Sequence, residues 1–146
     1  MDRKNFLKTC GFACAGAFLG VSLLEGCSSI RSVNANIEGD DMVLPVSDFE
    51  VRKGESLSYH KAVVARNQLL QFPICVFRNG ADDYAAVWMS CTHQGAELQL
   101  FGDRLQCPAH GSEFDSHGQV ANGPASKALR SFPIVMEGNQ LKISLK

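Results

Sequence analysis

The chain has 146 residues, a length that fits one domain of ordinary size. Its formal net charge of −1 at pH 7 is far from the strongly basic balance of a nucleic-acid-binding protein, so the composition argues against a nucleic-acid partner. Three of the six cysteines fall in or beside an apolar N-terminal run. The other three, an odd number that indicates no disulfide framework, are Cys75, Cys91 and Cys107.

The N-terminal segment has the layout of an export signal. A basic start that includes Arg3 and Lys4 precedes an uncharged, mostly apolar run over residues 10–24. That run is short for a membrane span and typical of a signal. We therefore predict an export signal over residues 1–26, with an uncleaved anchor or a plain secretory signal as the alternatives.

Two short motifs in this segment indicate a route and an anchor. The stretch "DRKNFLK" resembles a twin-arginine export motif, with Lys4 in place of the second arginine. The stretch "LLEGC" resembles a bacterial lipobox, in which Cys27 would be the lipid-accepting residue. A single lipidated N-terminus tethers a domain without spanning the bilayer. These resemblances imply an exported protein that is lipid-anchored on the periplasmic side of the membrane.

The next residues, "SSIRSVNANIEGDD" at 28–41, are polar, and no periodicity is evident in them. We predict a flexible tether over residues 27–41 and one domain over 42–146. From Met42 on, short apolar and β-branched runs alternate with turn residues, and no helical period of useful length appears. The pattern predicts an all-β domain.

Three hairpins are expected within this domain. The first joins strands over 73–77 and 84–89 through "RNGADD", a stretch rich in turn residues. The second covers residues 98–107 and turns at Gly102–Asp103, and the third covers 131–146 and turns at Gly138–Asn139. Further strands are predicted over 42–46 and 57–65.

Two Cys/His pairs flank the second hairpin. "SCTHQGAEL" contains Cys91 and His93, and "CPAHGSEF" contains Cys107 and His110 on a stretch whose proline and glycine indicate a turn. If residues 98–107 pair as a hairpin, its two ends meet and both pairs converge. Two thiolates and two imidazoles at one point predict a metal site.

The donor types alone leave two metals open. Two Cys and two His bind one zinc ion tetrahedrally, or a 2Fe–2S cluster with thiolates on one iron and imidazoles on the other. The surrounding "CTHQG", "CPAHGSEFD" and "GPA" closely resemble the Rieske iron–sulfur family, over about residues 42–146. The resemblance favours the 2Fe–2S cluster, and a zinc-stabilised interaction module remains the alternative.

The Rieske resemblance implies a fold and a ligand set. The fold would be an antiparallel β-sandwich with a small cluster-binding subdomain, at about residues 90–125, that carries two ligand loops. Cys91 and Cys107 would bind the inner iron, and His93 and His110 would bind the outer iron near the surface.

The same resemblance assigns roles around the cluster. Gly95 and Gly111 would permit tight turns, so that backbone N–H groups point at the sulfides. Ser112 would donate its hydroxyl hydrogen to a bridging sulfide. Pro124 would belong to a loop that covers the third side of the cluster. Phe114 stands where one branch of the family has a tyrosine that donates to a ligand sulfur.

That branch comprises the Rieske subunits of quinol-oxidising cytochrome complexes. Its two ligand loops also carry extra cysteines that form a disulfide, and Ala96 and Ala109 stand at those positions here. In lacking both the cysteine pair and the tyrosine, the sequence resembles the simpler Rieske ferredoxins. The motifs give no second ligand to pair with Cys75, His60 or His117. We expect Cys75 to be a buried core thiol and the two histidines to lie outside the site.

The implied function is electron transfer. With two thiolates and two neutral imidazoles the oxidised cluster carries no net charge, which raises its potential above that of a four-thiolate cluster. The partner would be a cytochrome, a molybdenum oxidoreductase or a quinol-oxidising membrane complex. The alternative is a ferredoxin-like component or small subunit that feeds a separate oxidoreductase or oxygenase chain, because after the cluster ligands only His60 and His117 remain to build an oxygenase iron site.

Overall fold

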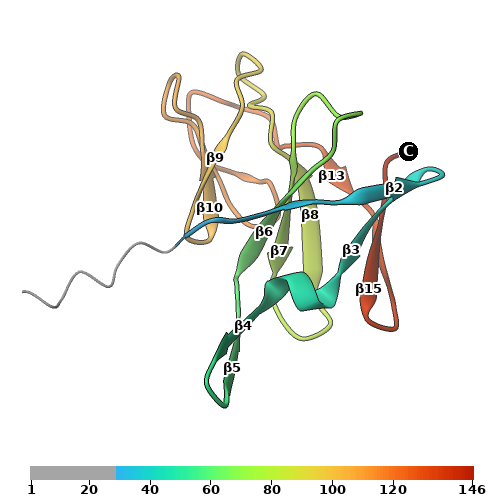
Figure 1. The fold of residues 1–146 in the computed structure, drawn as a ribbon. Helices are drawn as coiled ribbons and strands as arrows, with labels where there is room; N and C mark the ends of the chain where they lie inside the picture. The colour runs from blue at the N-terminus through green and yellow to red at the C-terminus, as the bar shows by residue number, and fades with distance from the viewer. Residues whose placement is uncertain (1–28) are drawn as a thin grey trace, which may run out of the picture.

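The computed structural model describes residues 29–146, and strands dominate it (Figure 1). Its only helical turn is a 3-10 turn over Val46–Phe49, so the all-β prediction is confirmed for the described residues. None of the described residues forms a helix that is long and apolar enough to cross a membrane. The strands are β1 (Arg31–Asn34), β2 (Asn36–Glu38), β3 (Asp41–Pro45), β4 (Glu50–Lys53), β5 (Ser56–Tyr59), β6 (Ala62–Arg66), β7 (Ile74–Arg78), β8 (Tyr84–Trp88), β9 (Gln99–Phe101), β10 (Arg104–Gln106), β11 (Glu113–Phe114), β12 (Val120–Asn122), β13 (Ser131–Phe132), β14 (Ile134–Glu137) and β15 (Gln140–Ser144).

A five-stranded sheet in the order β1-β6-β7-β8-β13 forms the centre of the fold. Its inner strands carry the apolar runs "AVVA", "ICVF" and "AAVW", and a strand that is apolar on both faces is a strand buried on both faces. Successive side chains point to opposite faces. Val64 and Cys75 therefore enter one core, while Val63 and Ile74 enter another.

The two cores differ in the sheet that closes them. The sheet β12-β11-β10-β9 and the loops beside it close the first, which we call the loop-side core. The sheet β14-β15-β3-β2 closes the second, which we call the far core. In Figure 1, β9 and β10 lie on one side of β6–β8, and β3 and β15 lie on the other. The fold is thus a β-sandwich with a core on each face of its central sheet. The sheet β12-β11-β10-β9 corresponds to the small cluster-binding part that the Rieske resemblance implies.

The tether prediction is wrong for residues 31–38. β1 pairs in parallel with β6, in a register that places Arg31 opposite Val63, and the Ala35 N–H donates to the Arg66 carbonyl at 2.9 Å. Val33, Ala35 and Ile37 alternate with polar residues and pack on the far core. This period of two was present in the sequence but hidden by its polar neighbours. Residues 1–26 and Cys27, which carry the predicted export signal and lipid site, lie outside the described residues.

The hairpins follow the sequence closely, with two differences. β7–β8 and β9–β10 are hairpins as predicted, and Gly102 at the second turn has a φ of +61°. The strand expected over 57–65 is divided at His60 and Lys61 into β5 and β6. In the third hairpin, β14 pairs with β15, whereas β13 pairs with β8 in the central sheet.

Candidate metal centre

The β9–β10 hairpin brings the two Cys/His loops together. Leu100 lies opposite Leu105, and Gln99 lies opposite Gln106. The predicted pairing is therefore confirmed for Gln99 and Leu100. The first loop leads into the hairpin and the second leaves it, so both lie at the end opposite its turn.

The first loop is a closed turn built on Cys91. The Gly95 N–H donates to the Cys91 carbonyl at 2.8 Å, and the Cys91 N–H donates to the Ala96 carbonyl at 2.8 Å. Gly95 has a φ of +74°, a conformation that side chains with a Cβ rarely adopt. The turn itself therefore requires glycine at position 95.

The second loop repeats this backbone arrangement. The Gly111 N–H donates to the Cys107 carbonyl at 3.0 Å, the Cys107 N–H donates to the Ser112 carbonyl at 2.8 Å, and Gly111 has a φ of +80°. Each glycine follows its cysteine by four residues, a spacing the sequence contained although the histidines differ in theirs. The N–H groups of the two glycines are occupied by cysteine carbonyls. Any N–H directed at a cofactor must come from other residues of the loops.

The four candidate donors form two layers. Cys91 and Cys107 are 3% and 2% exposed, and both are free thiols. His93 and His110 are exposed, and their ring centroids lie 5.0 Å apart with the planes at 89°. The same two loops thus supply two buried thiols and two imidazoles that face solvent.

A 2Fe–2S cluster with mixed ligands takes its thiolates on one iron and its imidazoles on the other. The two buried thiols and the two exposed imidazoles match this division of the ligands.

A third loop is tied to both ligand loops. The Ala125 N–H donates to Ser112 Oγ at 3.0 Å, and Ser112 is fully buried. Because Ser112 Oγ accepts this bond, its own hydrogen is free to donate. Thr92 Oγ1 donates to the Lys127 carbonyl at 2.6 Å, and the exposed Pro124 precedes Ala125. The Thr92 contact could not be predicted from local patterns, because its partner lies 35 residues further along the chain.

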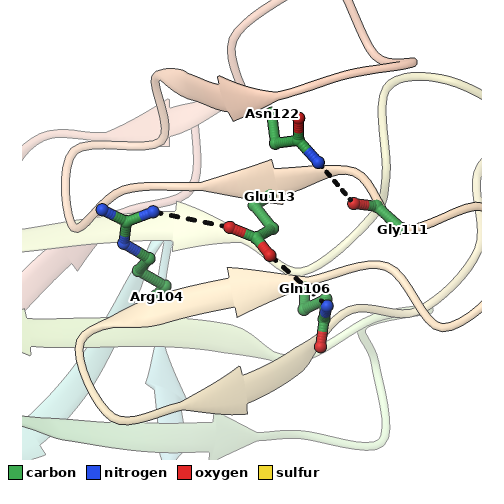
Figure 2. A network of polar contacts seen from close by, with 5 residues as sticks. All are labelled: Arg104, Gln106, Gly111, Glu113 and Asn122. Atoms are coloured by element: carbon green, nitrogen blue, oxygen red, sulfur yellow. Dashed lines mark hydrogen bonds and ion pairs between the residues drawn. The ribbon is translucent and has the colours of Figure 1, made fainter.

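A polar network connects the second loop to the strands beside it (Figure 2). The Glu113 carboxylate accepts hydrogen bonds from Arg104 Nη1 and Gln106 Nε2, each at 3.4 Å. Asn122 Nδ2 donates to the Gly111 carbonyl at 3.5 Å. These contacts join β10, β11 and β12 to the loop. Sequence patterns did not identify them, since they depend on which strands pair.

Phe114 shares a core with the two candidate cysteine ligands. It is fully buried on β11 opposite Leu105, in the same loop-side core as Cys91 and Cys107. Cys75 belongs to this core as well, and its burial raises the pKa of the thiol well above the ordinary range. Cys75 is therefore a protonated core residue, as predicted.

The remaining two histidines lie outside the two ligand loops. The His117 N–H donates to Asp115 Oδ1 at 2.9 Å within a turn beyond β11. The His60 N–H donates to the Phe49 carbonyl at 2.8 Å, beside the far core. The structure thus places Cys91 and Cys107 in one core and pairs His93 with His110, and it leaves the other two histidines elsewhere.

The all-β fold and the layered donors are those of an iron–sulfur protein. Residues 42–133, more than half of the chain, match the family description "Rieske [2Fe-2S] domain". The chain belongs to this family, whose cofactor is a Rieske-type 2Fe–2S cluster used for electron transfer.

Relatives within the family serve different systems. The dicamba O-demethylase oxygenase component of Stenotrophomonas maltophilia is 38% identical over 77 residues, which are 46% of this chain and 23% of that protein. The cytochrome b6-f complex iron-sulfur subunit 1 of Synechocystis is 34% identical over 73 residues, which are 49% of this chain and 41% of that protein. The chain spans less than half the length of these relatives.

Solved structures give the same picture. The cyanobacterial plasma membrane Rieske protein PetC3 from Synechocystis PCC 6803 superposes with a TM-score of 0.51 at 28% identity, over 57% of this chain and 86% of that one. This match supports the fold and the family.

Proposed function

We propose that this chain is an exported, membrane-tethered electron carrier. Cys91 and Cys107 bind the inner iron of its Rieske cluster, and His93 and His110 bind the outer iron. The observation that carries this assignment is that the same two loops hold a pair of exposed imidazoles, 5.0 Å apart, and a pair of buried thiols in one core. A bound cluster of this type accepts and releases one electron at a time.

The residues of the chain divide the work around that cofactor. The buried cysteines keep one iron away from water, while the exposed edges of His93 and His110 give a partner a short route for the electron. Ser112 has a free hydroxyl hydrogen to donate to a sulfide, which withdraws electron density and favours the reduced state. Phe114 excludes water from the inner side of the site.

The cofactor assignment has a direct test. The purified holoprotein should absorb in the visible, contain two irons and two acid-labile sulfides per chain as a 2Fe–2S cluster requires, and give an electron spin resonance signal after dithionite reduction. His93→Ala or His110→Ala should abolish that signal, and His117→Ala is the matched control that should keep it. A colourless protein with one zinc per chain would establish the zinc-stabilised module instead.

The export route and the anchor are tested separately. Iron–sulfur clusters are assembled before export, so a folded-protein pathway is required, and the change of Arg3 and Lys4 together to Gln should trap holoprotein in the cytoplasm. Cys27→Ser should abolish lipid labelling and release the protein from membranes. Normal export of the double variant would contradict the route, and an unlabelled wild-type chain would contradict the anchor.

The proposed partner is a cytochrome, a molybdenum oxidoreductase or a quinol-oxidising complex of a periplasmic or membrane redox chain. The likeness to a plasma membrane Rieske protein supports a membrane chain. The likeness to an oxygenase component supports the alternative, a ferredoxin-like component or small subunit for another chain. The described residues hold no disulfide beside the site, with Ala96 and Ala109 in the two loops, which argues against direct quinol oxidation. Co-purification from membranes and reduction by quinol, with and without membrane extract, separate these partners.

A further inference from the structure

An apolar surface surrounds the point at which the described chain begins. Ile30 is 54% exposed, Phe101 at the β9–β10 turn is 58% exposed, and Tyr59 is 39% exposed. Two adjoining open grooves, of about 550 and 380 Å³, share Ile30 and Phe101 in their walls. Arg31 and Lys61 also line the larger groove. We call Ile30, Arg31, Tyr59, Lys61 and Phe101 the entry face.

The sequence limits how far the entry face can lie from the predicted lipid site. Because β1 begins at Arg31, only residues 28–30 separate Cys27 from a strand of the central sheet. The four steps from Cys27 to Arg31 reach at most about 14 Å of extended chain. If Cys27 carries the anchor, a linker of this length keeps the entry face close to it, whereas the fifteen-residue tether would have let the domain turn freely.

The chemistry of the entry face suits a bilayer. Apolar and aromatic side chains enter the boundary between headgroups and acyl chains, while basic side chains lie among the headgroups. Ile30 and Phe101 supply the first kind, and Lys61 and Arg31 supply the second, with Arg31 also 3.6 Å from Asp48.

We propose that the entry face docks on the lipid bilayer and fixes the orientation of the domain. This inference rests on the lipid-anchored form of the proposed function. Docking places Ile30 and Phe101 at the headgroup boundary, with the turn of the β9–β10 hairpin facing the membrane.

The site then faces away from the membrane. The ligand loops begin at the end of the hairpin opposite Gly102, and five residues from Gly102 to Cys107 span about 15 Å of strand. Figure 1 shows the chain entering beside the turn of β9–β10, with the loops at the other end of these strands. His93 and His110 therefore meet an electron partner from the aqueous side. Such a partner is a water-soluble redox protein or the projecting domain of a complex.

Hydrogen exchange tests this orientation. The lipidated full-chain holoprotein is compared in detergent and in bilayer discs of phosphatidylethanolamine and phosphatidylglycerol. Slower exchange in discs is expected at residues 30–31, 59–62 and 100–104, with no change at 91–95 and 107–111. Protection of the ligand loops instead would mean that the cluster faces the bilayer, and equal exchange in both media would mean that the entry face stays in water. Either result overturns the proposal.

A matched pair of variants sharpens the test. Phe101→Ser should lose the protection at residues 30–31 and 59–62, whereas Val135→Ser, which changes an apolar residue of equal exposure (57%) on β14, should keep it. Retained protection in Phe101→Ser contradicts docking through the entry face. Mass spectrometry of Cys27 keeps the two proposals apart. A chain without lipid refutes the anchor and with it the docking, and a lipidated chain with an unprotected entry face refutes the docking alone.

Discussion

The two cores share one sheet but have different contents. The far core contains mostly aliphatic and aromatic residues, with Phe49, Met42 and Leu141 fully buried. The loop-side core uses the opposite faces of β6, β7 and β8, yet it contains every cysteine that the structure describes. The sandwich thus has one core that serves stability alone and one that also supports the site.

This difference limits how far a change near the site affects the packing of the far core. Because β-strand side chains alternate between faces, a change on one face of β7 need not reach the other. Val64 and Cys75 support the loops, while Val63 and Ile74 belong to the far core. Variants on the two sides should therefore separate loss of the cluster from loss of the fold.

The largest expected effect is the loss of the cluster. Cys107→Ser removes one proposed thiolate ligand, so visible absorbance and the spin resonance signal should disappear, while far-ultraviolet circular dichroism should keep its β-sheet signal. Cys75→Ser is the matched control, a third buried cysteine of the same core, and it should retain the cluster. Loss of the signal in the Cys75 variant alone would contradict the ligand assignment.

The next comparison removes an equal side chain from each core. Phe114 and Phe49 are both fully buried, so replacing either by Ala should lower the free energy of unfolding by about 3–5 kcal/mol. Only Phe114→Ala should also speed the loss of iron from the folded protein, measured by bleaching of the visible bands in mild chelator. Equal bleaching in the two variants would mean that the cores are not independent.

His110→Cys tests the charge of the ligand set. Four-thiolate 2Fe–2S centres have potentials of about −400 mV, whereas Rieske centres lie at about −150 mV or above. The variant, if it assembles a cluster, should show a marked fall in potential and lose the pH dependence due to that imidazole, as measured by protein-film voltammetry. His117→Cys adds a thiol outside the site and should leave the potential unchanged.

The smallest expected effects come from two residues beside the ligands. Phe114→Tyr adds a donor and should raise the potential by some tens of millivolts, because about 59 mV corresponds to a tenfold change for one electron. Ser112→Ala removes a donor and should lower it by a similar or larger amount. The Ser112 variant also leaves the Ala125 N–H without its partner. Asn122→Ala, which disturbs the second loop without removing a hydroxyl beside a sulfide, should therefore shift the potential less.

Most of the correct predictions came from patterns among neighbouring residues. Glycine and proline placed the turns, apolar runs placed β7 and β8, and the repeated Cys/His pairs identified the site. Information that depends on distant pairing was missed. β1 pairs with β6 across 32 residues of sequence, and Thr92 meets Lys127 across 35. No window of neighbouring residues contains both members of such a pair.

The folded domain extends beyond both ends of the stretch that matches the family, and this matters for expression. A fragment cut to residues 42–133 would lack β1, β2, β14 and β15. Both β6 and β3 would then present unpaired backbone groups to other chains, and Leu141 and Ile143, which are fully buried, would be missing from the far core. We expect such a fragment to aggregate through its open edges, whereas a fragment that begins before Arg31 and keeps β15 should remain monomeric in gel filtration.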